Sequence, residues 1–235
     1  ETLIKLYPRA TLRRMDSDTL KKKEDYKRIL TEFRQGKVDI LIGTQMIAKG
    51  LHFPNVTLVG IIYADLSLHI PDFRSGERTF QLITQVAGRA GRGEVEGDVY
   101  VQSLTPFHPA IQYARRHDYI GFYEQEWEFR QQTDYPPARR LALVTLRGLH
   151  EEKIRLSANH MRQALEQATT DISGVSFSGP APAPLERVEN HYRFQILVRA
   201  HRMQRLSVCM AEVLQSLRLP EGVKVSVDID PVNLC

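Results

Sequence analysis

A glutamine and two arginines in one short run are the side chains of this sequence best suited to contact a phosphate group. Gln85, Arg89 and Arg92 lie in the stretch Gln-Val-Ala-Gly-Arg-Ala-Gly-Arg, residues 85–92. Arg89 and Arg92 are three residues apart, so on a helix they would share one face. Guanidinium groups held on a rigid element are how many ATPases stabilise charge on the γ-phosphate. The alternative is a pair of solvated surface arginines beside a glycine that ends a helix.

A helix is the element that must position these side chains. The run before them, residues 77–87, places Phe80, Ile83, Val86 and Ala87 at helical spacing. This pattern predicts an amphipathic helix that delivers the arginines at its C-terminal end.

A second candidate phosphate contact follows a predicted buried strand. Residues 38–42 form a short apolar run that ends at Gly43 and Thr44. Ligands of open α/β sheets bind beyond the carboxyl ends of the strands, so the Thr44 hydroxyl and nearby backbone N–H groups could hold a phosphate. The alternative is a capping threonine in a turn from strand to helix. Further strands at 56–63 and 97–102, separated by helical patterns, predict an α/β fold with a parallel, doubly wound sheet.

Composition sets broad limits on the class of protein. The 235 residues are 42% hydrophobic and 26% charged, as in an ordinary globular protein. The net charge of +4 permits a nucleic-acid partner but does not require one. The two cysteines, Cys209 and Cys235, exclude a disulfide framework and a cysteine-based zinc site within the chain. With no apolar run of membrane-spanning length and no signal peptide, we expect a cytoplasmic protein without a membrane partner. The chain begins with Glu in mid-pattern, so we expect a fragment.

The clearest domain boundary is the run Tyr135-Pro136-Pro137, which predicts domains over residues 1–135 and 136–235. Before it, residues 109–132 read as one helical region rich in aromatic residues. Beyond it, strands are predicted at 141–146, 175–179, 192–199 and 223–229, and helices at 151–168 and 204–217, with a proline-rich bend over 180–184. The order β-α-β-β-α-β is that of an α+β ferredoxin-like domain.

Five arginines within nineteen residues suggest that this second domain binds single-stranded or branched DNA weakly through phosphate contacts. They are Arg187, Arg193, Arg199, Arg202 and Arg205. The interleaved Tyr192 and Phe194 could stack on bases, but both share a strand face with Ile196 and Val198, which favours a core position. The alternative is that the arginines are solvated and the domain docks other proteins.

Taken together, these stretches resemble a known family. Residues 41–56 and 85–92 look like motifs V and VI of superfamily 2 helicases. The runs Pro71-Asp72-Phe73-Arg74 to Leu82, Arg14 to Thr19 and Tyr135-Pro136-Pro137 narrow the resemblance to the bacterial primosomal replication-restart DNA helicases, the PriA family. The resemblance covers essentially the whole chain and identifies it as the second, RecA-like helicase lobe followed by a C-terminal domain.

The resemblance implies an ATP-dependent motor that binds forked or single-stranded DNA, unwinds it 3′ to 5′ and assembles the primosome at stalled forks. By motif, Gly50, Gln85, Arg89 and Arg92 would contact ATP, with Arg89 and Arg92 catalytic. Gly43, Thr44 and Gln45 would hold the DNA backbone, together with Arg193 and Arg199 of the second domain. Other primosome proteins and single-strand-binding protein would be partners. His52 departs from the Asp that many superfamily 2 helicases carry at this position.

The chain lacks several parts of the family pattern. There is no P-loop, so ATP and Mg²⁺ would be held mainly by a first lobe that this chain does not contain, and the family's zinc site would also lie outside it. We therefore expect the chain alone to be inactive as an ATPase. An adaptor or nucleic-acid-binding module with a helicase-lobe fold, and another superfamily 2 branch such as an RNA helicase, are the alternatives.

Overall fold

The chain folds into two compact units in a computed structural model that describes residues 2–16, 23–44, 55–88 and 97–234. One unit comprises residues 1–68 and 76–122, and the other comprises residues 69–75 and 123–235. Residues 69–75 therefore group with the C-terminal unit, although in the sequence they lie between the two stretches of the first unit.

The first unit begins with α1 (Thr2–Leu6), β1 (Leu12–Met15), α2 (Lys23–Arg34) and β2 (Ile40–Gly43). β1 and β2 pair in parallel, with Met15 opposite Gly43. Ile29 and Leu30 of α2 pack with Met15 in a small core, and partly buried Tyr26 and Phe33 lie against it. α2 presents these residues because they recur at helical spacing.

A second parallel pair consists of β3 (Leu58–Ile61) and β4 (Asp98–Val101). Helical segments pack against this pair. The 3-10 turn η2 (Leu66–His69) and α3 (Ser75–Ala87) lie between these strands in sequence, and α4 (Pro109–Arg115) and α5 (Tyr119–Gln132) follow them. Phe80 of α3 stacks on Phe122 of α5 with ring centroids 4.3 Å apart, within a core that includes Ile61 and Ile83.

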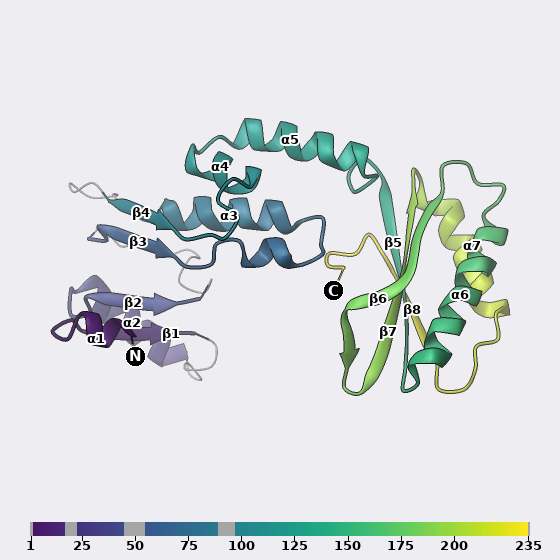
Figure 1. Cartoon of the computed structure of the whole chain (residues 1–235), viewed down its shortest axis with the longest axis horizontal. Helices are drawn as coiled ribbons and strands as arrows, with labels where there is room; N and C mark the ends of the chain where they lie inside the picture. The colour runs from purple at the N-terminus through teal and green to yellow at the C-terminus, as the bar shows by residue number, and fades with distance from the viewer. Residues whose placement is uncertain (1, 17–22, 45–54, 89–96, 235) are drawn as a thin grey trace. The chain divides into compact units, whose positions relative to one another are not determined.

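The C-terminal unit is built on a four-stranded antiparallel sheet with the strand order β6-β7-β5-β8. Its elements in sequence are β5 (Arg140–Gly148), α6 (Glu151–Ala168), β6 (Ser176–Val188), β7 (His191–Ala200), α7 (Met203–Ser216) and β8 (Lys224–Ile229). Figure 1 shows α6 and α7 on the same face of this sheet.

Alternation along the strands defines the main core between the sheet and these two helices. Val144 and Leu146 of β5, with Phe194, Ile196 and Val198 of β7, point toward the helices and are buried. Ile154, Met161 and Leu165 of α6 close the core from the other side. Successive strand residues point to opposite faces, so the intervening residues of β5 and β7 form a second face away from the helices.

Two segments differ from the sequence-based expectation. The proline-rich run 180–184 was expected to be a bend between strands, but it lies inside β6, which continues to Val188 with two register shifts against β7. β6 is an edge strand of the sheet, where proline costs no interstrand hydrogen bond on the open side. The helical region 109–132 is broken into α4 and α5, and His117 between them has a left-handed φ of 53°.

Candidate nucleic-acid interface and nucleotide-facing helix

α3 buries one side and leaves the predicted phosphate contact on the other. Gly76, Thr79, Phe80 and Ile83 are buried, at spacings of three and four residues. Gln85, in the last turn of the helix, is exposed. The helix therefore fixes the position of Gln85 through its packed face and leaves the amide available to a ligand.

The other described residues of the helicase-type motifs lie at the carboxyl end of β2. Gly43 and Thr44 are both exposed there, next to the end of β1 in the parallel pair. Exposed backbone and hydroxyl groups at this edge suit contacts with a phosphate backbone. Gln45, Gly50, Arg89 and Arg92 lie outside the described residues.

The second face of the C-terminal sheet is divided into an apolar half and a polar half. Toward the start of β5, Leu141 and Leu143 cluster with Leu234 and Phe73, and partly buried Leu197 lies against them. Gln195 of β7 donates a hydrogen bond to the Leu234 carbonyl at 3.2 Å, so the segment after β8 covers this half. The other half carries the polar residues Thr145 and Ser226, which pair across β5 and β8.

A row of three cations crosses the polar half of this face. Arg147 of β5 pairs with Arg193 of β7 on one side and with Lys224 of β8 on the other. Directly opposed residues of antiparallel strands point to the same face, so the three side chains form a cross-strand row, called here the basic row. Arg147 and Lys224 are exposed, and Arg193 is half-buried, with Nη1 3.4 Å from the Leu185 carbonyl.

The basic row has an unfavourable local electrostatic arrangement. None of its three side chains forms an ion pair with a carboxylate among the described residues. Like charges opposed across strands are destabilising. An anion that lies across the strands would relieve this repulsion, and a nucleic-acid backbone supplies such charges in series.

Arg199, the other arginine expected to bind DNA on this strand, is held by local contacts. Its guanidinium lies 4.9 Å from the centroid of the Tyr135 ring, and Nη1 donates to Ser178 Oγ at 2.7 Å. These contacts assign Arg199 to the packing of the apolar half. Arg187 of β6 lies over the ring of Tyr192, at 5.1 Å, while Phe194 is buried in the main core.

Arg147 and Lys224 were missed because they stand far from Arg193 in the sequence. The cluster of arginines drew attention to residues 187–205, whereas the row is assembled by strand pairing over separations of 46 and 77 residues, from 147 to 193 and from 147 to 224. The signal that could have found Arg147 is the register of β5 against β7, which places Arg147 directly opposite Arg193.

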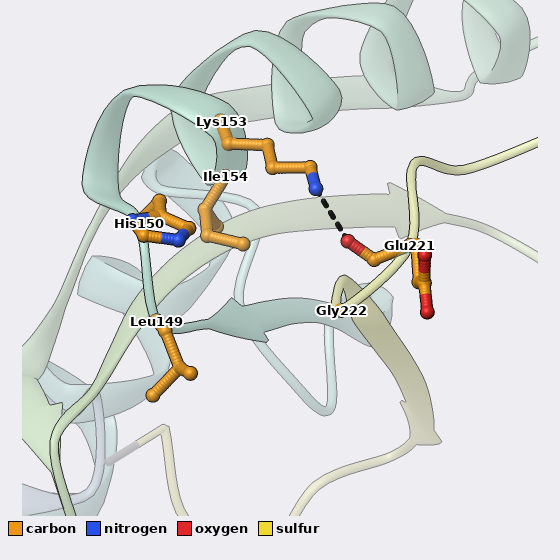
Figure 2. A pocket seen from close by; sticks show the side chains of 6 residues that line it. All are labelled: Leu149, His150, Lys153, Ile154, Glu221 and Gly222. Carbon is orange, nitrogen blue, oxygen red and sulfur yellow. Dashed lines mark hydrogen bonds between the residues drawn. The ribbon is translucent and has the colours of Figure 1, made fainter.

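A shallow hollow of about 190 Å³ lies where α6 begins (Figure 2) and is lined by Leu149, His150, Lys153, Ile154, Glu221 and Gly222. Lys153 Nζ donates to the Glu221 carbonyl oxygen across it. At neighbouring Gly148, an added Cβ would approach Ile154 Cδ1 to 2.6 Å and the Gly222 carbonyl oxygen to 2.8 Å. The backbone beside the hollow is therefore closely packed, and the side chains that line the hollow form no catalytic arrangement.

Residues 2–16, 23–44, 55–88 and 97–234 hold neither a metal-binding cluster nor a membrane-spanning helix. In that part of the chain, no three His, Cys, Asp or Glu side chains come together in a way that could hold a metal ion. None of its helices is both long enough and apolar enough to cross a membrane.

Comparison with known proteins assigns both parts of the chain. Residues 2–94 match the helicase conserved C-terminal domain, and residues 131–232 match the primosomal protein N C-terminal domain. Three curated relatives carry the name replication restart protein PriA. The protein from Bacillus subtilis is 43% identical over 98% of this chain, that from Treponema pallidum 40% over 100%, and that from Synechocystis 38% over 100%.

The chain thus combines a helicase C-terminal domain with a primosomal C-terminal domain. It belongs to the PriA family of replication restart proteins, as a C-terminal fragment. It spans 29%, 35% and 28% of the length of the Bacillus, Treponema and Synechocystis relatives, respectively.

Proposed function

We propose that the protein to which this chain belongs is an ATP-dependent 3′–5′ DNA helicase of replication restart, and that this chain supplies helicase motifs V and VI. The run 85–92 carries the proposal, because its glutamine lies exposed in the last turn of a helix that is packed on its opposite side. The identity to proteins named for replication restart supports the same conclusion.

Gln85, Arg89, Arg92 and Gly50 are assigned to the nucleotide. When ATP with Mg²⁺ is bound by an upstream lobe, the arginines compensate the charge that develops on the γ-phosphate, and Gln85 donates or accepts hydrogen bonds beside it.

DNA is assigned to two places in the chain. Gly43, Thr44 and Gln45 hold the backbone of one strand at the carboxyl end of β2. In the C-terminal domain the basic row, which includes Arg193, contacts phosphates, whereas the contacts of Arg199 favour a structural role. The strand order β6-β7-β5-β8 and the order of elements support a ferredoxin-like arrangement for this domain. We propose residues 1–135 and 136–235 as the two domains, a boundary that lies 13 residues after the one between the compact units at 122/123. Other primosome proteins and single-strand-binding protein are its proposed partners.

The test of the nucleotide assignment is Arg92→Ala in the full-length protein. We expect DNA-stimulated ATP turnover to fall by about 10³-fold or more, because a transition-state arginine contributes on that order to the rate. DNA affinity should stay within about threefold of the parent. The control is Arg34→Ala, which removes an exposed arginine in the last turn of α2.

The competing function is an adaptor that keeps a helicase-lobe fold without motor work. It is favoured by the lack of a P-loop in this sequence, so that the chain itself carries no motif that grips the β-phosphate. If Arg92→Ala turns over ATP within tenfold of the parent, the motif VI assignment is wrong and the adaptor becomes the better description.

A further inference from the structure

The short segment Asp72-Phe73-Arg74, called here the docking segment, precedes α3 in the sequence but belongs to the C-terminal unit by its contacts. A loop between a strand and a helix of one domain normally packs on that domain. Here, Asp72 and Phe73 are buried at 6% and 7% exposure by residues that follow position 123.

Phe73 is the apolar anchor of the docking segment. Its ring stacks on that of Tyr135, with centroids 5.0 Å apart and planes 13° from parallel. The guanidinium groups of Arg74 and Arg130 lie 4.5 and 5.2 Å from its centroid. Together with Leu141, Leu143 and Leu234, the ring fills the apolar half of the second sheet face.

Asp72 contacts both its own turn and the segment that follows β8. Oδ1 accepts a hydrogen bond from the Arg74 backbone N–H at 2.8 Å, as in an Asx turn. Oδ2 accepts from the Leu234 N–H at 3.4 Å. The Ser75 N–H donates to the Asp72 carbonyl at 3.0 Å, so the turn continues directly into the helix.

Arg74 adds two charge-assisted hydrogen bonds to the same C-terminal segment. Nη1 donates to the carbonyl oxygens of Pro231 and Val232, each at 2.8 Å. Leu234 is held in turn by Gln195 of β7. A chain of contacts therefore runs from the sheet, through residues 231–234, to Asp72 and Arg74, which directly precede α3 in the sequence.

We propose that Asp72, Phe73 and Arg74 are positioning residues that tie α3 to the C-terminal domain, so that DNA bound by that domain changes nucleotide turnover through this helix. α3 is a rigid element of 13 residues, about 20 Å long, with Gln85 in its last turn and Arg89 and Arg92 next in the sequence. The C-terminal domain holds the docking segment, which continues directly into this helix along the chain. The inference rests on the proposed function, since it needs the motif after α3 to face ATP.

The experiment uses Arg74→Ala in the full-length protein, with Arg74→Lys as the conservative variant. ATP turnover is measured with and without single-stranded DNA, and DNA affinity is measured with and without a non-hydrolysable ATP analogue. Coupling between two sites is typically worth 5- to 150-fold. We expect R74A to reduce the stimulation by DNA about tenfold while turnover without DNA and DNA affinity stay within about twofold.

Lys at position 74 keeps a cation beside the Phe73 ring and one donor for a carbonyl, so R74K should recover part of the stimulation. Because linkage is reciprocal, the effect of the ATP analogue on DNA affinity should shrink in R74A by the same factor. The matched control is Arg155→Ala, whose arginine is paired with Glu152 on the outer side of α6. R155A should behave as the parent does.

Arg92→Ala is assayed in parallel to separate the two proposals. If R92A is inactive and R74A keeps full stimulation by DNA, the positioning role is overturned and the function stands. Equal loss of turnover with and without DNA in R74A, without recovery in R74K, also overturns it, because a general loss of fold is then the cause. Active R92A overturns the proposed function itself. Thermal unfolding of each variant identifies any that fail to fold.

Discussion

The carboxylate of Asp65 holds together two loops of the first unit. Only 1% of the residue is exposed, and Oδ2 accepts hydrogen bonds from the backbone N–H groups of Leu104 and Thr105, at 2.8 and 2.9 Å, and from Thr105 Oγ1 at 3.0 Å. Burial alone would raise the pKa of this carboxyl. Hydrogen bonds from the Ser103 side chain, the backbone and Thr105 outweigh it and lower the pKa from 3.8 to about 2.

Asp65→Asn should therefore lower the free energy of unfolding at neutral pH. A depressed carboxyl pKa stabilises the folded state fully above the unfolded-state value, near 3.8, and this contribution is lost as the pH falls toward about 2. The difference between parent and variant in urea midpoint should be largest above pH 5 and should shrink steadily between pH 4 and 2. The control is Asp98→Asn at the exposed start of β4. A difference that is constant over this pH range would contradict the assignment.

At the scale of the element, strand pairing divides the second face of the C-terminal sheet, the face away from α6 and α7, into an apolar half and a polar half. The half near Leu141 and Leu143 is covered by Phe73 and Leu234, while the half with the basic row stays polar. The nearest carboxylate on the same face of β8 is that of Asp228, four residues or about 13 Å from Lys224 along the strand. The row therefore keeps its positive charge, at a cost to stability.

Arg147→Gln should weaken DNA binding and stabilise the fold at the same time. Removing the central cation relieves two cross-strand repulsions, each on the order of 0.2–1 kcal/mol. It also removes one phosphate contact, so the log–log salt dependence of single-strand affinity should become shallower by about 0.7. Both are measured on the full-length protein, by urea unfolding and by titration of a labelled oligonucleotide at several salt concentrations.

Arg140→Gln is the matched control, at the opposite end of the same strand. Arg140 pairs with Asp230, which holds the pKa of Arg140 above and that of Asp230 below their usual values. This variant should lose stability and leave the salt dependence unchanged. If R147Q binds DNA as tightly as the parent at every salt concentration, the basic row is not part of the interface.

At the scale of the whole molecule, the chain holds two compact units with separate cores. The core of one unit includes Phe80, Ile83 and Phe122, and that of the other lies between the sheet and α6 and α7. Each of these cores is made of residues of its own unit. We therefore expect the chain to fold on its own, whether or not it can turn over ATP.

The isolated chain should therefore fold cooperatively and show no ATP hydrolysis, with or without DNA. The expected inactivity follows from the lack of a P-loop sequence that would grip the β-phosphate and Mg²⁺. Circular dichroism on heating and a phosphate-release assay measure the two properties, with the full-length protein as the positive control. Phosphate release above background by the purified chain, if abolished by Arg92→Ala, would reveal a nucleotide site that this sequence does not predict.

The sequence alone determined the elements whose burial repeats with a local period. The spacing of Phe80 and Ile83 predicted the helix observed as α3, and alternation from Tyr192 to Val198 predicted the strand observed as β7, because each pattern depends on residues a few positions apart. The roles of Gln85, Arg89 and Arg92 stay predictions. Strand pairing, by contrast, places Arg147 between Arg193 and Lys224, and tertiary packing places Phe73 against Tyr135. Those neighbours are set by strand register and by chain segments that meet across 46 to 77 residues, and side-chain periodicity carries no information over such separations.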